Sequence, residues 1–352
     1  MLLNSQTVKK AAKAMKGASA MLLIAAASTG MSGVSMAADS SQGYSAHPQA
    51  QAFMDELVSK HDFSREELQQ WFAQAEKKQS ILNAMSRPAE KTKTWGEYRN
   101  IFIQPSRIDK GVEFWIEHKD TLERAEEVYG VPAEIIVAII GVETRYGSNK
   151  GSYKVIDALS TLAFDYPKRS AFFTKELRHY LLLAREQNRD PLALKGSYAG
   201  AMGYGQFMPS SYREYAKDFD GDNAVDIWDN PVDAIGSVAN YFVRHGWKSD
   251  KPVVSRARVS EGYNRTVIND SLRPKRTVAE LAEQGITPIE GIEGTAKATA
   301  MKLKGEQGAE FWVGLQNFYT ITRYNHSRLY AMAVYQLSQE VRREMDATKT
   351  AG

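Results

Sequence analysis

The stretch VPAEIIVAIIGVETRYG, from Val131 to Gly147, is almost wholly apolar and ends on a short polar motif. Its apolar residues recur at spacings of three and four, so they fall on two adjacent stripes of a helix. The stripes consist of Ile136 and Ile140, and of Ile135, Ile139, Val142 and Tyr146. Pro132 is typical of a first helical turn, and Gly147 of the position that follows a helix end. We therefore expect a buried helix over 131–146.

Glu143 lies on the stripe of Ile136 and Ile140, one turn before the expected helix end. Burial among apolar neighbours raises the pKa of a carboxyl, and the partial negative charge of a helix C-terminus acts in the same direction. A carboxyl that stays protonated near neutral pH suits a general acid for cleavage of a glycosidic bond. The competing interpretation is a glutamate at a helix end that pairs with Arg145 or with a distant cation.

Composition places the chain among ordinary globular proteins. Of its 352 residues, 43% are hydrophobic, 25% are charged and 10% are aromatic. These values exclude wholesale disorder, collagen and a fibrous coiled coil. The chain contains no cysteine, which excludes a disulfide scaffold, a cysteine zinc site, an iron–sulfur cluster and a thiol nucleophile.

Residues 1–37 have the three parts of a secretory signal peptide. They contain four lysines and no acidic residue, then an apolar run over 21–27, and a small-x-small site at 35–37. An uncleaved membrane anchor is the alternative, but the apolar run is short and Ser28, Thr29 and Gly30 interrupt it. Because no cysteine is available for a lipid anchor, we expect a soluble exported protein without membrane attachment.

The charge balance argues against nucleic acid as a partner. Without residues 1–37 the chain has 41 basic and 42 acidic residues, a net charge of −1. Proteins that bind nucleic acid carry a basic footprint that matches the phosphate backbone, and this chain has none in its overall balance.

The patterning of the remaining chain predicts an α+β protein that is mainly helical. Residues 38–49 are rich in Ser, Gln and Gly, and we expect a disordered lead there. Helical periodicity fills an N-terminal region over 50–126 and a core over 127–250. The last part, 251–352, combines strand-like stretches with a short helix, opened by a capping box of Thr277 and Glu280, and a final helix over 328–345.

Residues 218–229, DFDGDNAVDIWD, form a candidate metal-binding loop. Acids at loop positions 1, 3, 5, 9 and 12, and a backbone carbonyl at position 7, offer the oxygen ligands that calcium takes in an EF-hand. The candidate ligands are Asp218, Asp220, Asp222, Ala224, Asp226 and Asp229. Two departures are Asn223 at the usual glycine position and aspartate at position 12. An acidic surface turn is the alternative, but five acids at these offsets favour a structural metal site.

Two further stretches suggest a ligand groove. Residues 200–206 are rich in glycine, which permits close approach of a backbone to a ligand, but their spacing is not that of a dinucleotide fingerprint. Ser197 and Gln206 would add directional hydrogen bonds beside this loop. An aromatic and polar set follows near the C-terminus, and it suits a carbohydrate groove: Tyr319, Tyr324, Asn325, His326 and Tyr330. The alternative is core tyrosines with satisfied hydroxyls.

Several of these pieces occur together in one known family. They are GVETRYG at 141–147, GYGQFMPSSY at 203–212, the acidic loop at 218–229, NPVDAIGSVANYF at 230–242 and RYNHS at 323–327. With these motifs the chain closely resembles the B-type lytic murein transglycosylases of Gram-negative bacteria, from residue 48 to residue 345.

The resemblance implies a lysozyme-like helical core, with a helical N-terminal part and a small mixed C-terminal part that completes the groove. It also implies that Glu143 is the single catalytic acid and base. Glu143 would protonate the oxygen between N-acetylmuramic acid and N-acetylglucosamine in peptidoglycan, and would then take the proton of the muramic C6 hydroxyl. The product would be a 1,6-anhydromuramic end.

By the same resemblance, a set of side chains would line the glycan groove. These residues are Tyr98, Arg169, Ser197, Gln206, Tyr241, Tyr324, Asn325 and Tyr330. Lys168 departs from the family pattern, which has arginine at both of the positions that match 168 and 169. The resemblance further implies structural calcium in the acidic loop, no organic cofactor, a periplasmic location, and action as a monomer on peptidoglycan strands.

One physical point agrees with the resemblance independently. Retaining glycosidases need two carboxylates about 5 Å apart, and this sequence offers one strong candidate. A nucleophile within the substrate removes the need for the second carboxylate. Two alternatives stay open at this point: a muramidase that hydrolyses the same bond, and a peptidoglycan-binding protein without catalysis.

Overall fold

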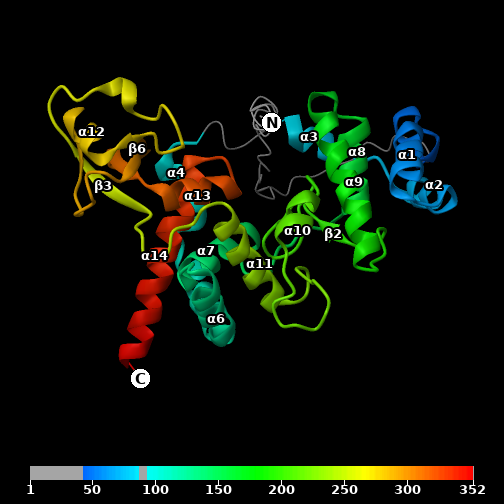
Figure 1. Ribbon diagram of the computed structural model, residues 1–352, viewed down its shortest axis with the longest axis horizontal. Coiled ribbons are helices and arrows are strands. Elements are labelled where there is room, and N and C mark those ends of the chain that lie inside the picture. The colour runs from blue at the N-terminus through cyan, green and yellow to red at the C-terminus, as the bar shows by residue number, and fades with distance from the viewer. Residues whose placement is uncertain (1–42, 87–92, 352) are drawn as a thin grey trace, which may run out of the picture.

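The computed structural model describes residues 43–86 and 93–351, so the predicted signal peptide lies outside the described residues. The described chain is mainly helical with a small antiparallel sheet, which confirms the expected fold class. In Figure 1, β3, β6 and α12 lie at one end of the molecule and α1 and α2 at the other, with α7 and α11 between them. None of the described helices is long and apolar enough to cross a lipid bilayer.

The helices of one group share a hydrophobic core with the first described residues. Tyr44 and Phe72 belong to this core, as do Leu159 of α8 and Leu177 of α9. The group comprises a 3-10 turn (Tyr44–Ala46), α1 (Pro48–His61), α2 (Arg65–Gln74), α3 (Gln79–Ser86), α8 (Val155–Phe164), a 3-10 turn (Pro167–Arg169), α9 (Ser170–Glu186) and α10 (Pro209–Tyr215). Beside it lies the short pair of β1 (Tyr153–Lys154) and β2 (Lys195–Gly196).

A second core lies around α7 (Ala133–Thr144), which confirms the helix predicted over 131–146 to within two residues at each end. Every residue of α7 is buried except Glu134 and Glu143. The helices around it are α4 (Trp95–Phe102), α5 (Pro105–Glu117), α6 (Lys119–Tyr129), α11 (Pro231–Arg244), α13 (Gln316–Tyr324) and α14 (Arg328–Ala351). Of these, α5, α6, α11 and α14 pack directly on α7.

The small sheet has the strand order β4-β6-β7-β3-β5, with every pair antiparallel. Its strands are β3 (Val254–Val259), β4 (Arg276–Thr277), β5 (Ile286–Pro288), β6 (Lys297–Gly305) and β7 (Gly308–Gly314). A 3-10 turn (Arg265–Val267) and α12 (Val278–Glu283) complete this part. The capping box of Thr277 and Glu280 is present at the start of α12, as predicted.

One predicted feature does not hold. The predicted disorder over 38–49 does not hold for the described residues 43–49, because Tyr44 is buried and its hydroxyl donates to Asp165 at 2.5 Å. The described part of the predicted N-terminal region over 50–126 is helical, and its helices divide between the two cores. Its first three helices pack with α8 and α9, whereas α4, α5 and α6 pack around α7.

The C-terminal end of α7 is fixed by a tyrosine in a narrow slot. Arg145 and Tyr146 both take left-handed backbone conformations, with φ of 53° and 57°. This turn carries the Tyr146 ring back between α5 and α7, where Cβ atoms at Gly111 and Gly141 would lie 2.6 and 2.5 Å from its hydroxyl. Burial raises the pKa of Tyr146 above its usual range. The two glycines are therefore required for the turn that ends α7.

This slot predicts the effect of a single methyl group. We expect Gly141→Ala to lower the free energy of unfolding by about 1–3 kcal/mol, because the added Cβ would force the buried Tyr146 ring to move. Gly294→Ala is the matched control, since its Cβ would meet its nearest neighbour at an ordinary 3.6 Å. Urea unfolding of both variants measures the difference. Equal unfolding free energies would contradict the slot.

Candidate functional site

Glu143 lies one residue before the end of α7 and faces α14. The Tyr330 hydroxyl of α14 donates a hydrogen bond of 2.5 Å to Glu143 Oε1. Tyr330 is 1% exposed. Its burial, together with the nearby Glu143 charge, raises the pKa of Tyr330 well above the usual range. The phenol therefore stays protonated and remains a donor, which orients this carboxyl group.

Two more tyrosines stand close to this pair. Burial and then the charge of Glu143 raise the pKa of Tyr324, which donates its hydroxyl to Gly205 O at 2.6 Å. The Tyr241 ring lies 4.7 Å from the Tyr324 ring between centroids, and its hydroxyl donates to Arg323 O at 2.6 Å. Each hydroxyl is thus committed to a backbone carbonyl, and the rings form a rigid aromatic wall.

The glycine-rich loop at 200–206 is tied to the end of α7 through Thr144. Thr144 Oγ1 accepts from Gly147 N at 3.0 Å and lies 3.0 Å from Tyr204 O. Thr144 is 1% exposed, so these bonds lie away from water. A Cβ at Gly205 would lie 2.7 Å from the Tyr324 hydroxyl, which explains the glycine there. The loop, α7 and α13 therefore hold one another in place.

Three other predicted groove residues are buried, and they differ in their hydrogen bonds. Gln206 is buried and donates to Gly203 O and Lys150 O at 3.0 and 3.2 Å. Tyr98 is buried in the core around α7, to which Tyr330 also belongs. Asn325 is 4% exposed, and its side-chain nitrogen has no hydrogen-bond partner among the described residues.

Ser197 and Arg169 have structural contacts that sequence patterns do not reveal. Ser197 Oγ accepts from Ala201 N at 3.0 Å, so it shapes the glycine-rich loop. The Arg169 guanidinium lies over the Phe172 and Phe173 rings, 4.4 and 5.1 Å from their centroids. Phe172 lines a small cavity of about 40 Å³ together with Gln206, Tyr241 and Tyr324, which brings Arg169 to the rim of the site.

Three residues near the site were not predicted from the sequence. Arg107 is 8% exposed, and its Nη1 donates to Gly141 O at 2.6 Å near the end of α7. Glu176 is buried and accepts from the backbone and the hydroxyl of Ser210 at 2.9 and 2.8 Å. Thr144 could have been found, because it follows Glu143 directly in the motif. Arg107 and Glu176 could not, since each acts on a segment more than thirty residues away.

The acidic loop brings only part of its predicted ligand set together. Carboxylate oxygens of Asp218, Asp220 and Asp222 lie within 4.8 Å of one another. Asp226 instead pairs with Arg189 at 2.8 Å, and Asp229 pairs with Lys150 at 3.1 Å. The structure therefore gathers three of the six predicted ligands, and the full ligand set stays a prediction.

The donor chemistry of the three clustered carboxylates fits a hard cation, because all the candidate ligand atoms are oxygens. Asn223 has φ of 70°, so it takes the left-handed conformation expected where an EF-hand has glycine. Asp218 accepts from Gly221 N and Asn223 N at 2.7 and 2.9 Å, which winds the loop tightly around the cluster. Nothing in the structure assigns a role to the carbonyl of Ala224.

Comparisons with known proteins agree with one another. The model of a family described as "Transglycosylase SLT domain" matches residues 45–339. The membrane-bound lytic murein transglycosylase B of Escherichia coli K12 is 48% identical over 305 residues, which covers 84% of this chain and 83% of the relative.

Solved structures give the same result. Soluble lytic transglycosylase SltB1 from Pseudomonas aeruginosa matches with a TM-score of 0.81 at 55% identity, over 84% of this chain and 99% of that one. Escherichia coli Slt35 in complex with calcium matches with a TM-score of 0.80 at 47% identity, over 87% and 96%. SltB3 from Pseudomonas aeruginosa, in complex with NAG-NAM-pentapeptide, matches with a TM-score of 0.76 at 29% identity, over 84% and 79%.

The hydroxyl of Thr144 allows a test of the hydrogen bonds that tie the glycine-rich loop to the end of α7. We expect Thr144→Val to lower the free energy of unfolding by about 1–3 kcal/mol, because Gly147 N loses its acceptor inside the protein. Thr144→Ser keeps the oxygen and should cost less. Urea unfolding curves of both variants measure the two losses. A serine variant less stable than the valine variant would show that the methyl group, and not the hydrogen bonds, holds the loop to the end of α7.

Proposed function

The chain belongs to the transglycosylase SLT domain family and is a lytic murein transglycosylase, and from this premise we propose which bond it cleaves and how. The proposed substrate is the glycan strand of peptidoglycan. The proposed bond is the β-1,4 link between N-acetylmuramic acid and N-acetylglucosamine, and the proposed product ends in 1,6-anhydromuramic acid. The observation that carries this proposal is Glu143 at the end of a buried helix, hydrogen-bonded to a tyrosine that remains a donor.

In the proposed reaction Glu143 acts twice. Its protonated carboxyl gives a proton to the glycosidic oxygen as the bond from that oxygen to the muramic anomeric carbon breaks. The muramic C6 hydroxyl then attacks the anomeric carbon, and its proton returns to Glu143. The carboxyl is restored, and no water is consumed. Tyr330 is proposed to keep one oxygen of this carboxyl fixed during both steps.

A single carboxyl is sufficient for this chemistry, because the nucleophile belongs to the substrate and is held beside the carbon that it attacks. An ordinary retaining glycosidase would need a second carboxylate about 5 Å away. Glu176 is a second carboxyl near the site, and both of its oxygens already accept from Ser210. This commitment supports the proposal that Glu143 works alone.

The proposed groove residues divide into those that shape the groove and those that can contact sugar. Tyr241, Tyr324 and Gln206 donate hydrogen bonds to backbone carbonyls. They would therefore contact a sugar by packing against it and not by further hydrogen bonds from these groups. Asn325 has a buried side-chain N–H with no hydrogen-bond partner in the described parts of the chain, and a sugar hydroxyl or an acetamido carbonyl would accept from it. We propose Tyr98, Arg169, Ser197 and Tyr330 as the remaining groove residues.

We propose that the protein acts in the periplasm, as a monomer, after removal of residues 1–37. The support is the sequence of that segment, with its basic start, apolar run and small-x-small site. The E. coli relative is named as membrane-bound and SltB1 as soluble. No cysteine exists in this chain to carry a lipid.

We also propose that the acidic loop binds calcium with Asp218, Asp220 and Asp222. The cluster of their carboxylates and the left-handed backbone of Asn223 support this, and so does the calcium complex of Slt35, which is 47% identical. When bound, calcium would neutralise the mutual repulsion of the three carboxylates and hold the loop.

Glu143→Gln tests the catalytic proposal. We expect release of soluble products from purified murein sacculi to fall by at least about 10³-fold, because the amide cannot supply or accept the proton. Glu134→Gln, on the same helix, is the matched control and should retain activity. Mass spectrometry of the wild-type products decides between the reactions. Anhydro ends are expected, and reducing ends heavier by one water would identify a hydrolytic muramidase. Full activity of Glu143→Gln would refute the proposal.

Calcium should stabilise the folded protein. At a calcium concentration a hundredfold above the dissociation constant, we expect about 2.7 kcal/mol of stabilisation, seen as a rise in melting temperature over the EDTA-treated protein. Asp222→Ala should abolish this rise, whereas Asp109→Ala, which removes an exposed acid of α5, should retain it. A titration in constant sodium chloride separates calcium from sodium. An unchanged rise in Asp222→Ala would exclude the loop as the site.

A further inference from the structure

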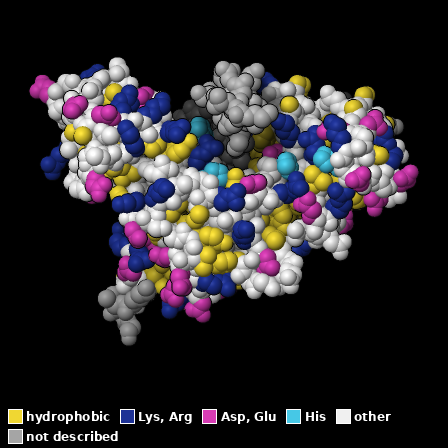
Figure 2. All heavy atoms as spheres, viewed as in Figure 1, with side chains coloured by type: hydrophobic (Ala, Val, Ile, Leu, Met, Phe, Trp, Pro, Cys, Tyr) yellow, Lys and Arg dark blue, Asp and Glu magenta, His cyan; other side chains and the backbone are white. Residues whose placement is uncertain are grey.

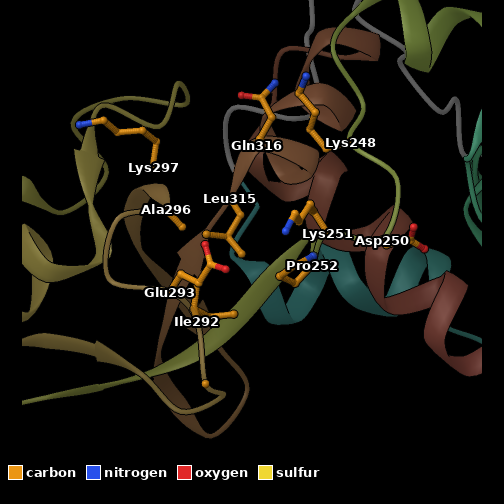
Figure 3. A pocket seen from close by; sticks show the side chains of 11 residues that line it. Lys248, Asp250, Lys251, Pro252, Ile292, Glu293, Ala296, Lys297, Leu315 and Gln316 are labelled. Atoms are coloured by element: carbon orange, nitrogen blue, oxygen red, sulfur yellow. The ribbon is translucent and has the colours of Figure 1, made fainter.

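A cavity of about 390 Å³ lies where the sheet meets the helical core, apart from the site at Glu143. Figure 3 shows that its walls come from the 248–252 connection, the 291–297 loop and the junction of β7 with α13. The volume falls within the range of about 300–1,000 Å³ that is usual for small-ligand pockets. The cavity therefore has room for part of an organic molecule.

The lining of this cavity combines an apolar floor with separated charges. Leu315 is 5% exposed and forms the floor with Ile292. In Figure 3 the side chains of Lys251 and Glu293 point toward this floor from opposite walls, whereas Asp250 points away. Both charged residues line the cavity, and no ion pair joins them within the described residues. An ammonium and a carboxylate that face one space without neutralising each other are available to a ligand of mixed charge.

The backbone of the lysine wall is rigid. Asn317, which is fully buried, accepts from Lys248 N at 2.8 Å. Its side-chain nitrogen donates to the carbonyls of Lys248 and Lys251, each at 2.8 Å. Three hydrogen bonds from one buried side chain thus fix the 248–251 connection, so a ligand would not have to order it.

Helix α13 connects this cavity to the site at Glu143. Gln316, its first residue, lines the cavity, and its last residue, Tyr324, stands in the aromatic wall beside Glu143. Nine residues of helix span about 13 Å. Gln316, Tyr319 and Arg323 lie on one face at spacings of three and four, and all three are partly exposed. A polar, partly exposed face of α13 therefore extends from the cavity at Gln316 toward the site at Glu143.

From these observations we propose that the cavity binds the free end of a peptide carried by the glycan strand, with a carboxylate against Lys251 and an N–H or ammonium group against Glu293. The inference rests on the proposed function, which places the sugar at Glu143. Five extended peptide residues reach about 17 Å, which exceeds the length of α13. SltB3, at 29% identity, is known in complex with a saccharide that carries a pentapeptide.

Two lysines at the rim of the cavity also favour a peptide that carries carboxylates. Lys248 and Lys297 line the cavity, and in Figure 3 their side chains extend away from its centre. Lys248 has no carboxylate within ion-pair distance among the described residues, and Lys297 has only Glu280, at 4.0 Å. These lysines would attract the carboxylates of a peptide before it reaches Lys251.

The test compares two substrates in the intact enzyme. The first is a set of glycan strands that carry pentapeptides, and the second is the same strands after an amidase has removed the peptides. We expect the wild type to have the higher kcat/KM on the peptide-bearing strands. Lys251→Ala and Glu293→Ala should each reduce that preference by about tenfold, through KM, and leave the rate on bare strands unchanged. Lys302→Ala, an exposed lysine of β6 outside the cavity, is the matched control and should behave as wild type.

Each outcome of this experiment decides one of the two proposals. If the wild type releases products from neither substrate, the proposed function fails. If it cleaves both substrates but the cavity variants keep the wild-type preference, the function stands and the cavity proposal is overturned. If both variants lose activity equally on the two substrates, the residues act on the fold, and the cavity proposal is again overturned.

Discussion

The burial of all but two residues of α7 is the constraint on which the rest of the structure depends. A helix that is apolar on every side must be covered on every side, and each buried isoleucine or valine contributes about 1.5–3 kcal/mol when it leaves water. Helices α5, α6, α11 and α14 supply that cover, although α14 comes from the far end of the chain. Glu143 and Tyr330 meet because they lie on two members of this arrangement. Their short hydrogen bond is therefore a consequence of core packing as much as of local chemistry.

The same constraint explains what the sequence could predict. Periodicity within one segment predicts α7, and capping chemistry within four residues predicts the start of α12. Motifs single out Glu143 and the acidic loop because their spacing is local, and the structure brings three of the loop's acids together. The division of residues 50–126 between two cores could not be predicted, since it depends on contacts with α8 and α14. Asp226 and Asp229 fit the ligand pattern by spacing, but their ion pairs with Arg189 and Lys150 could not be predicted, because these partners are distant in sequence.

The candidate site lies where the two cores meet, and this position accounts for its mixture of rigid and polar groups. Tyr241 belongs to the core of α8 and α9, although its neighbour Phe242 belongs to the core of α7. Tyr324 packs against both cores. A junction of this kind brings backbone carbonyls such as those of Gly205 and Arg323 inside the protein, where they need donors. The tyrosine hydroxyls meet that need, so the wall beside Glu143 is fixed by hydrogen bonds at no cost in unsatisfied groups.

The acidic loop is connected to this wall through α11. Asp233, in the first turn of α11, is fully buried and accepts from Phe219 N and Asp226 N, each at 2.7 Å. The loop and the helix therefore share one carboxylate as a common anchor. Tyr241 lies eight residues further along the same helix, about 12 Å away. Because a helix transmits a displacement of its first turn to the next turns, a loop that loses its shape would disturb α11. A cation held by this loop, as proposed above, would then act on the site through the position of α11.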